Sequence, residues 1–451
     1  MRRRTILLIT SMLGLASVAF TVRSTLPNPI TSPNGSGTLS TYSTTGPIDV
    51  TTPFFQNLGT NGRTCNSCHV SSTAWTISPV EVQTRFNSTN GTDPIFRTVD
   101  GSNCPSADVS TLAARRTAYS LLLSKGLIRI SLPVPPTADF QITDIQDPYS
   151  CPQTTPTQPA LYRRPLPSTN IPYLTTVMWD GRESPKGRSL DANLTQQAID
   201  ATSGHAQGAV TPTADQLQQI VAFEMALYTA QSADRGAGAL NARGAMGGPT
   251  NLSAQEFYVG INDVLGADPE GHPFDSKAFT TYDAWTDSPT PQKASIARGQ
   301  ALFNTFPITI TGVAGLNDLP GLSTVNGTCT TCHDSPNVGN HSVPLAINIG
   351  ITDYPAMPAL DISGLPVYTI TCKDGTVLHT TDPGRAMITG KCADVGKTKG
   401  PILRGLSARA PYFHNGSAKT LDDAVEFYNQ RFQLGFTDQQ KNDLVAFLKT
   451  L

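Results

Sequence analysis

Apolar side chains recur at helical spacing in several separate stretches of the chain. The clearest stretch begins at Thr213, where Gln216 follows three residues later in the pattern of a capping box. A stripe at helical spacing follows, made of Leu217, Ile220, Val221, Glu224, Leu227 and Tyr228. We therefore predict an amphipathic helix from Thr213 to Tyr228.

Four further stretches predict helices in the second half of the chain. Their predicted ranges are 253–265, 293–303, 420–432 and 437–451. In the third of these, the apolar stripe consists of Leu421, Val425, Tyr428 and Phe432, spaced by four, three and four residues. Because this spacing keeps to one face of a helix, Tyr428 is expected to face inward.

Other stretches favour strands, loops or an extended arm. Residues 367–372 and 376–379 flank Asp374-Gly375, which is typical of a β-hairpin. Between residues 131 and 172, proline is too frequent for any long helix, so this segment is expected to wrap around the protein. Residues 25–50 are rich in Ser, Thr, Pro and Gly, and we expect a flexible N-terminal arm there.

The N-terminus has the pattern of an export signal. Three arginines at positions 2–4 precede an apolar run over 6–20 that is too short for a confident membrane span. We predict a signal peptide over residues 1–24 and a periplasmic protein; an uncleaved membrane anchor is the alternative. Loss of residues 1–19 would remove three arginines and leave 29 basic against 34 acidic residues, a balance that does not indicate nucleic-acid binding.

One five-residue sequence word occurs twice. The words are Cys65-Asn66-Ser67-Cys68-His69 and Cys329-Thr330-Thr331-Cys332-His333. In a CxxCH word, two thiols attach a c-type haem and the histidine ligates its iron. A zinc half-site is the alternative for a single copy, but two copies behind an export signal predict two covalently bound haem c groups. The iron ligands would be His69 and His333.

The remaining four cysteines suit an oxidising compartment. The simplest pairing by proximity along the chain joins Cys104 to Cys151 and Cys372 to Cys392. The other two connectivities remain open at this stage.

The axial position opposite each histidine decides what each iron can do. Iron with both axial sites filled mainly transfers electrons, whereas iron with one open site can bind peroxide. Between His69 and His205 there is no other histidine, and the only methionine is Met178. The first iron is therefore a candidate for an open site.

Two further motifs accompany the CxxCH words and together carry a family resemblance. They are Trp179-Asp180-Gly181-Arg182, preceded by Asn170, and Ala410-Pro411-Tyr412-Phe413-His414-Asn415-Gly416-Ser417, preceded by Pro401-Ile402-Leu403-Arg404. In this order they resemble the bacterial dihaem cytochrome c peroxidases and their relative MauG, over most of residues 55–451. The resemblance implies two cytochrome c-like haem domains, here 51–290 and 291–451. The predicted fold is mainly α, with long Pro-rich loops and a small β-hairpin.

The resemblance also implies roles for two aromatic residues. Tyr428, seventeen residues after Pro411, matches the sixth ligand of the second haem, where MauG-like members have tyrosine and typical peroxidases have methionine. A core tyrosine is the alternative, and Met387, His341 and His379 are competing ligands. Trp179 matches the tryptophan between the two haems and could relay charge, or it could be a buried core residue.

The resemblance matches the family's catalytic groups beside the first haem only in part. The family places a glutamine there, which Gln197 matches by motif position, and a glutamate ten residues later, where this chain has Gln207. An amide cannot carry a proton between peroxide oxygens, so His205 is our candidate acid and base. His205 could instead be a sixth iron ligand or an exposed loop histidine.

Two weaker expectations concern His414 and calcium. His414 is expected to brace its loop rather than to take part in chemistry. A calcium ion like that of the family could be held by Asp93 and by backbone carbonyls near Arg409 and Pro411.

These observations predict an exported dihaem c-type cytochrome that reduces hydrogen peroxide at the first haem. Electrons would come from a small periplasmic donor protein through the second haem, and the membrane would be involved only if the signal segment were not cleaved. One alternative is a MauG-like oxidase that acts on a protein or an organic substrate. Another is a non-catalytic electron-transfer cytochrome.

Overall fold

The computed structural model describes residues 24–451, and the predicted signal peptide lies almost wholly outside the described residues. Within this range, no helix is long and apolar enough to cross a membrane. The structure has ten α-helices in this range. They are α1 (Pro79–Thr89), α2 (Leu112–Ala118), α3 (Ser120–Lys125), α4 (Leu190–Gly204), α5 (Ala214–Ala226), α6 (Pro249–Ser253), α7 (Pro291–Thr305), α8 (Ala386–Thr389), α9 (Leu421–Arg431) and α10 (Asp438–Leu448).

Fifteen short strands accompany the helices in the described range. They are β1 (Thr25–Leu26), β2 (Ile30–Asn34), β3 (Gly37–Ser43), β4 (Ile48–Asp49), β5 (Ile128–Ser131), β6 (Phe140–Gln146), β7 (Ala160–Arg163), β8 (Leu227–Asp234), β9 (Gly238–Ala239), β10 (Ile308–Thr311), β11 (Thr324–Gly327), β12 (Ala346–Ile347), β13 (Val367–Cys372), β14 (Val377–Thr380) and β15 (Thr398–Lys399). The prediction of a mainly α fold is therefore confirmed only in part, because the structure mixes helices with many short strands. Apart from β13 and β14, the sequence pattern missed these strands because most are too short to show alternation.

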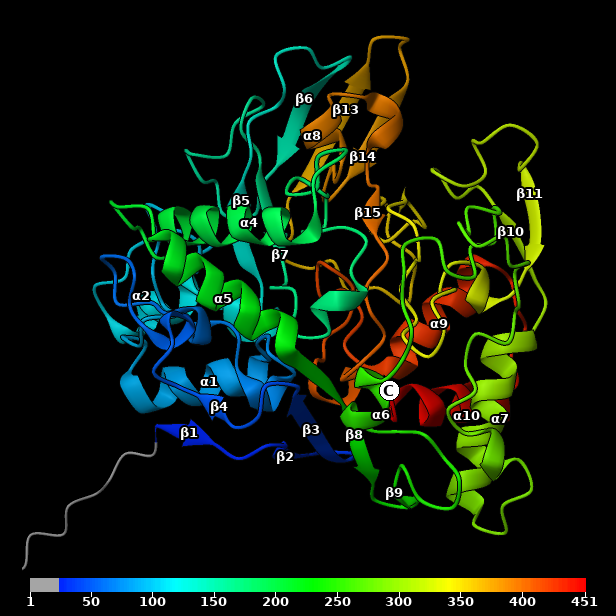
Figure 1. Cartoon of the computed structure of the whole chain (residues 1–451). Helices are drawn as coiled ribbons and strands as arrows, with labels where there is room; N and C mark the ends of the chain where they lie inside the picture. The colour runs from blue at the N-terminus through cyan, green and yellow to red at the C-terminus, as the bar shows by residue number, and fades with distance from the viewer. Residues whose placement is uncertain (1–23) are drawn as a thin grey trace, which may run out of the picture.

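Helices gather on two sides of the molecule, with strands above and below them (Figure 1). Helices α1, α2, α4 and α5 lie on one side, and α7, α9 and α10 lie on the other. The predicted hairpin is confirmed as β13 and β14, and β6 from the Pro-rich segment adds to it in the order β14-β13-β6. The Pro-rich segment thus pairs with the second half of the chain instead of only wrapping around it.

The segment 25–50 is not the loose arm that its composition suggested. It forms β1 to β4, and β3 lies inside the four-stranded antiparallel sheet β2-β3-β8-β9. Thr41 of β3 is buried, and its hydroxyl accepts a hydrogen bond from the indole nitrogen of Trp75 at 3.0 Å. The polar side chains of this segment therefore serve as internal hydrogen-bond partners, which composition alone does not show.

Most predicted helices are confirmed, with two corrections. Thr213 caps α5 as expected, but the helix ends at Ala226, and Tyr228 belongs to β8. The stretch 253–265 is wrong as a helix, because α6 ends at Ser253 and a series of turns follows. Helices α7, α9 and α10 begin within two residues of their predicted starts.

Two apolar cores support the two CxxCH words. Around the first word, Phe54, Trp75 and Ile220 are buried together, with Cys65 packed against them. Around the second, α7 and α10 pack closely, and Gly299 approaches the backbone of Asp443 where a larger residue would clash. This second core also includes residues from Ala237 to Trp285, which precede the predicted domain boundary near residue 290.

Both predicted disulfides are confirmed. Cys104 is bonded to Cys151 and Cys372 to Cys392, with Cα–Cα distances of 5.5 and 5.8 Å. The first bond closes the Pro-rich segment, and the second joins β13 to the turn after α8. The four cysteines of the CxxCH words are free.

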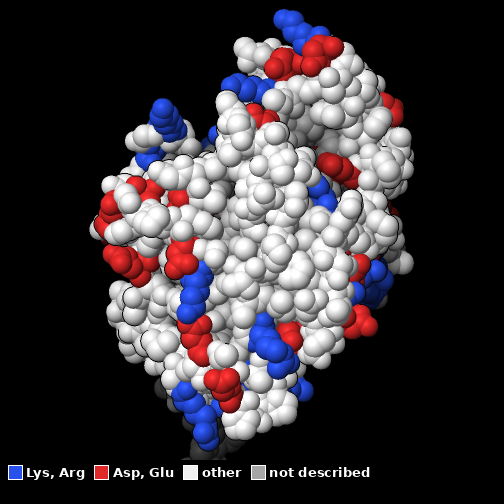
Figure 2. Space-filling view, turned by 90° about the vertical axis from the view of Figure 1, so that its right-hand side faces the viewer, with Lys and Arg blue, Asp and Glu red and all other residues white. Residues whose placement is uncertain are grey.

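One face of the molecule carries few charges in proportion to its area (Figure 2). Basic and acidic side chains lie interspersed on it, and neither sign forms a broad patch. This face is the side where α7, α9 and α10 lie in Figure 1.

Candidate haem-binding sites

The two CxxCH words adopt the same local structure. Each is a 3₁₀ turn in which the histidine N–H donates to the carbonyl of the first cysteine, at 3.0 Å for His69 and 3.2 Å for His333. Each turn is preceded by a threonine, Thr64 or Thr328, that forms a reciprocal capping box with the third residue of the turn. The turn therefore presents two cysteines and one histidine on the same side.

Each word lines its own cavity. Cys65, Cys68 and His69 line one cavity. Cys329, Cys332 and His333 line a second cavity. A large space with free thiols and an imidazole on its wall is what covalent haem attachment requires.

Both histidines are held in the orientation that an iron ligand needs. Nδ1 of His69 lies 3.0 Å from the carbonyl oxygen of Trp75, and Nδ1 of His333 lies 2.7 Å from that of Gly339. Burial lowers the pKa of each imidazole to about 4. A neutral imidazole that donates through Nδ1 keeps Nε2 free for a metal.

The wall between the two cavities is rich in buried cations. Arg164, Lys399 and Arg409 line both cavities, and Arg404 lines the first. Among the described residues, none of the four has a carboxylate partner within 4.0 Å. Burial lowers the pKa of Lys399 to about 7 and that of Arg409 to about 10. Unpaired buried charges are costly, so this wall fits the propionate carboxylates of haem, and the residues present fit the cofactor.

His205 is the terminal group of a buried ionic chain in the first cavity. It follows the last residue of α4, and its Nδ1 lies 2.5 Å from Oδ2 of Asp100. Oδ1 of Asp100 accepts a hydrogen bond from Nη1 of Arg63 at 2.5 Å, and Arg63 also donates to the His205 carbonyl. Burial raises the pKa of Asp100, but its bonds to His205 and Arg63 outweigh this and lower it. The carboxylate thus orients the imidazole, with Nδ1 as donor.

The two candidate glutamines are separated by the structure. Gln197 on α4 lines the first cavity, as does Met178. Gln207 is exposed, and its Oε1 accepts a hydrogen bond from Asn61 at 3.2 Å. Gln207 therefore does not occupy the position that the family glutamate was expected to have, whereas His205 lines the first cavity.

Sequence reasoning missed a carboxylic acid in the first cavity. Glu224 on α5 is 6% exposed, lines the cavity and is hydrogen-bonded to Ser168. Burial raises the pKa of Glu224 to about 7. The hydroxyl of Ser168 lies 2.9 Å from Nδ1 of His69, so Ser168 connects the carboxyl group to the histidine of the CxxCH word. The signal was present in the sequence, because Glu224 falls within the apolar stripe of its helix.

The second cavity receives Tyr428 from α9, as the apolar stripe of that helix predicted. Its ring packs against Phe427 and Phe432, and burial raises the pKa of its hydroxyl. Of the competing ligands, His341 also lines this cavity. Met387 is buried near the β13 hairpin, and His379 is exposed on β14. Tyr428 as the sixth ligand stays a prediction.

Trp179 lies on the wall that the two cavities share. Its indole nitrogen donates to the carbonyl of Arg164 at 2.8 Å, and its ring centroid is 5.9 Å from that of His414. A relay between two haems would occupy this position, and that role of Trp179 stays a prediction.

The two signature motifs are joined by a buried ion-pair network. Arg163 pairs with Asp180 of the Trp-Asp-Gly-Arg motif and with Asp382, at 2.5 and 2.7 Å. Asp382 in turn lies 3.5 Å from Nε2 of His414 in the second motif. His414 is buried and lines the second cavity, so bracing the loop is a role that its surroundings allow.

The residues expected to hold calcium do not fit that ion. Asp93 is paired with Arg85, at the end of α1. The carbonyl of Arg409 accepts a hydrogen bond at 2.9 Å from the guanidinium of Arg164, which also donates to the carbonyls of Ile77 and Lys125. The cation beside these carbonyls is thus a side chain of the protein.

No protein-family model matches the chain. Among curated proteins, it is 34% identical over 138 residues to cytochrome-c peroxidase IdrP2 of Denitromonas iodatirespirans, which covers 28% of this chain and 37% of that protein. It is 29% identical over 192 residues to IdrP1 of the same organism, covering 38% and 44%. The cytochrome c551 peroxidase of Nitrosomonas europaea is 33% identical over 140 residues, covering 30% and 34%. The chain thus spans less than half the length of each of these relatives.

Among solved structures, the chain is similar to a MauG-like protein associated with microbial copper homeostasis. The TM-score is 0.39 at 16% identity, with 88% of this chain and 85% of that one covered. A score this low adds no weight, so the family rests on the curated relatives and on the motifs. The predicted resemblance to the bacterial dihaem cytochrome c peroxidases is confirmed over these matched segments, because the curated relatives are cytochrome-c peroxidases.

Proposed function

We propose that this protein is an exported dihaem c-type peroxidase. Hydrogen peroxide would be reduced in the first cavity, with electrons passed through the second. The observation that carries the proposal is the oriented imidazole of His205 beside the first CxxCH word, where the second word has Tyr428 instead. The peroxidase relatives support the same chemistry at the level of the family.

The haem groups, when bound, supply the redox chemistry that reduces peroxide. The chain holds them through the thiols of its four free cysteines and through Nε2 of His69 and His333. The cationic wall formed by Arg164, Lys399 and Arg409 neutralises the propionates. These residues would hold one haem in each cavity, and Trp179 lines both cavities.

His205 supplies the proton transfer that splitting of a peroxide requires. Asp100 accepts the hydrogen bond from Nδ1, so Nε2 is the nitrogen that can take a proton from one peroxide oxygen and return it to the other. Arg63 keeps Asp100 ionised, because its guanidinium pairs with the second carboxylate oxygen. Gln197 donates or accepts a hydrogen bond that positions the bound peroxide.

Trp179 and Tyr428 complete the electron path in this proposal. Trp179 would offer an oxidisable indole between the two cavities, and Tyr428 would supply its phenol oxygen as the second protein ligand of the second iron. The electron donor is a small redox protein of the periplasm. Because Tyr428 stands where typical peroxidases have methionine, a MauG-like oxidase that acts on a protein or organic substrate is the second candidate.

The spin state of the ferric holoprotein tests this proposal most directly. Electron paramagnetic resonance should show one high-spin haem, because the first iron keeps an open axial site, and one low-spin haem. A spectrum with two low-spin haems would mean that His205 or Met178 fills the first site. That result would establish an electron-transfer cytochrome and would exclude the peroxidase.

A substitution of His205 tests the acid and base role. In steady-state turnover of peroxide with a reduced cytochrome or dye, His205→Gln should lower kcat/KM by about 10²- to 10⁴-fold. His379→Gln is the matched control, because His379 is exposed on β14 and lines neither cavity. Equal activity of the two variants would remove His205 from the mechanism.

A substitution of Tyr428 tests whether this residue is a ligand of the second iron or only a core residue. Tyr428→Phe keeps the packing against Phe427 but removes the hydroxyl. The spectrum of the second haem should change while the high-spin signal of the first remains. An unchanged spectrum would show that Tyr428 is a core residue and not a ligand.

A further inference from the structure

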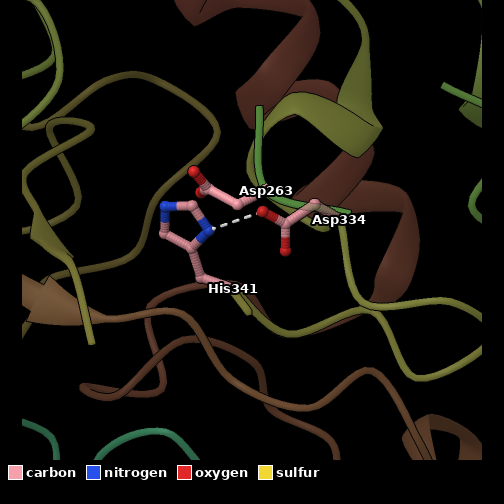
Figure 3. Close-up of side chains that lie close together, drawn as sticks. All are labelled: Asp263, Asp334 and His341. Carbon is pink, nitrogen blue, oxygen red and sulfur yellow. Dashed lines mark hydrogen bonds and ion pairs between the residues drawn. The ribbon is translucent and has the colours of Figure 1, made fainter. Parts of the chain in front are cut away.

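A cluster of three buried polar side chains lies beside the second haem cavity (Figure 3). One ligand atom from each of Asp263, Asp334 and His341 lies within 4.8 Å of the other two. The three residues are 1%, 0% and 4% exposed. None of them belongs to the attachment of either haem, although Asp334 directly follows His333.

The cluster is built from two loops that are fixed to each other. The amide of Gly260 donates to the carbonyl of Ser342 at 2.8 Å, and the side chain of Asn262 donates to the carbonyl of Asp334 at 3.0 Å. These two hydrogen bonds connect the loop that carries Asp263 to the loop that carries Asp334 and His341. The side chains therefore meet in a preformed arrangement.

Only one of the two carboxylate oxygens of Asp263 has hydrogen-bond partners in the described part of the chain. Its Oδ2 accepts hydrogen bonds from the amides of Leu265 and Ala267, at 3.0 and 2.8 Å. Its Oδ1 is buried and has no hydrogen-bond partner in the described part of the chain. The carboxyl group points toward the imidazole of His341 (Figure 3). A buried carboxylate oxygen left without a partner is costly, so this atom points to a missing ligand.

The charge of the cluster is also not balanced. Asp334 accepts from the amide of Ser342 at 2.7 Å and lies 3.1 Å from Nδ1 of His341. Within residues 24–451, no Lys or Arg side chain lies within 4.0 Å of Asp263 or Asp334. Two carboxylates and one imidazole in a dry site are the donor set of a divalent cation, and the nitrogen donor favours a transition metal over calcium or magnesium.

We propose that Asp263, Asp334 and His341 bind one divalent transition-metal cation of the zinc type. Two carboxylate oxygens and one imidazole nitrogen are three protein ligands, and a water molecule would be the fourth. The ion would join the loop over 260–268 to the loop that follows the second CxxCH word. It would thereby fix the segment that holds His333.

The test begins with the holoprotein as purified. Elemental analysis should find a third metal beside the two haem irons, and treatment with dipicolinate should remove it while the covalent haems stay. Titration of the stripped protein with Zn²⁺ in a calorimeter should show one equivalent per chain and a higher Tm. A wild-type protein that binds no Zn²⁺ at one equivalent would overturn the proposal, whatever its peroxidase activity.

Substitutions locate the site. Asp263→Asn and His341→Gln should each abolish the stoichiometric binding of Zn²⁺ and the gain in Tm. His272→Gln is the control, because His272 is exposed and lies 3.8 Å from both Asp268 and Glu270, another group that could attract zinc. Binding that survives in the first two variants, or that is lost in the control, would contradict the assignment.

A measurement on the wild type guards against variants that fail to fold. X-ray absorption at the zinc edge should show a shell of oxygen and nitrogen at about 2.0–2.1 Å with one imidazole and no sulfur. A shell without imidazole, or one that contains sulfur from the CxxCH thiols, would overturn the proposal. Haem content serves as the check of folding and does not depend on the bound cation.

Discussion

The two CxxCH cavities share their attachment chemistry and differ in almost everything else. Both words form the same capped turn, and both histidines donate through Nδ1 to a backbone carbonyl. The first cavity, however, contains Asp100, Glu224 and His205, whereas the described residues that line the second include no carboxylate. Its space is enclosed mainly by aliphatic and aromatic side chains, with Tyr428 among them.

The residues that would attach a haem are thus the same in the two cavities, whereas the residues that could take part in catalysis differ. A proton carrier is needed only where peroxide is split, and the carboxyl groups of Asp100 and Glu224 and the imidazole of His205 line only the first cavity. A dry apolar cavity suits an iron that only exchanges electrons, because less rearrangement accompanies the change of charge. The shared wall with Trp179 and three cations belongs to both cavities.

The largest expected effect comes from breaking the ion-pair network behind that wall. Asp382→Asn leaves Arg163, which is 2% exposed and lines the first cavity, without its bidentate partner. Loss of one partner of a buried pair should lower the free energy of unfolding by about 3–5 kcal/mol. Urea denaturation followed by circular dichroism and by haem absorbance measures it.

Asp374→Asn is the matched control for this prediction. Asp374 lies exposed at the turn of the β13–β14 hairpin, close to Asp382 in sequence, and only accepts a local hydrogen bond from Thr376. Its substitution should change stability by less than about 0.5 kcal/mol. Similar stabilities of the two variants would mean that the network does not hold the wall between the cavities.

A smaller effect, confined to the first cavity, is expected from Asp100→Asn. The amide keeps the shape of Asp100 but no longer fixes Nδ1 of His205 as a donor. Peroxide turnover should fall by about 10- to 100-fold, a part of the full acid and base contribution, and its pH profile should shift. The spectrum of the second haem should stay as in the wild type; a change there would show that the two cavities are not independent.

The helices and the attachment residues could be predicted from the sequence because their signals are local. The capping boxes at Thr213 and Thr437 depend on neighbours three residues away, as do the CxxCH turns. The inward position of Tyr428 followed from spacing along a single helix. The disulfides followed from proximity along the chain in an oxidising compartment.

What could not be predicted depends on partners distant in the sequence. Thr41 is buried because it pairs with Thr229 of β8, and Asp100 acts on His205 from more than a hundred residues away. In the sequence, Glu224 is one polar residue in an apolar stripe. Its link to His69 through Ser168 is visible only in the structure. These contacts cannot be predicted from the composition of the chain or from the periodicity of its apolar residues.

Glu224 gives a pH-dependent way to distinguish the cavities. Its pKa is raised to about 7 in the folded protein, against about 4.3 in an unfolded chain. The folded state therefore binds this proton more tightly, and the stability that protonation contributes is lost as pH rises from about 4.3 to about 7. Relative to Glu224→Gln, the wild type should lose on the order of 2–3 kcal/mol between pH 4.5 and 8.

Asp215→Asn on the same helix is the control for the pH series. Asp215 is exposed in the first turn of α5 and faces no cavity. Its variant should follow the wild-type dependence on pH across the window. If Glu224→Gln also follows it, the carboxyl group of Glu224 does not titrate in this range, and the first cavity is less distinct from the second than its lining residues indicate.

The smallest expected effect concerns the side of the first haem that His69 occupies. Ser168→Ala removes the hydroxyl 2.9 Å from Nδ1 of His69, while the second word has only the carbonyl of Gly339 at the same atom. A weaker acceptor at Nδ1 makes the imidazole a poorer donor to ferric iron, so the midpoint potential of the first haem should rise. One neutral hydrogen bond of about 0.5–1.5 kcal/mol corresponds to roughly 20–65 mV for one electron.

A redox titration that resolves the two haems measures this shift. The second haem should keep its potential, because no atom near His333 has changed. Equal shifts in both haems would mean that the substitution acts through the shared wall and not through His69. A shift in the first haem alone would extend the difference between the cavities to the histidine side of the iron, where the two attachment words otherwise look alike.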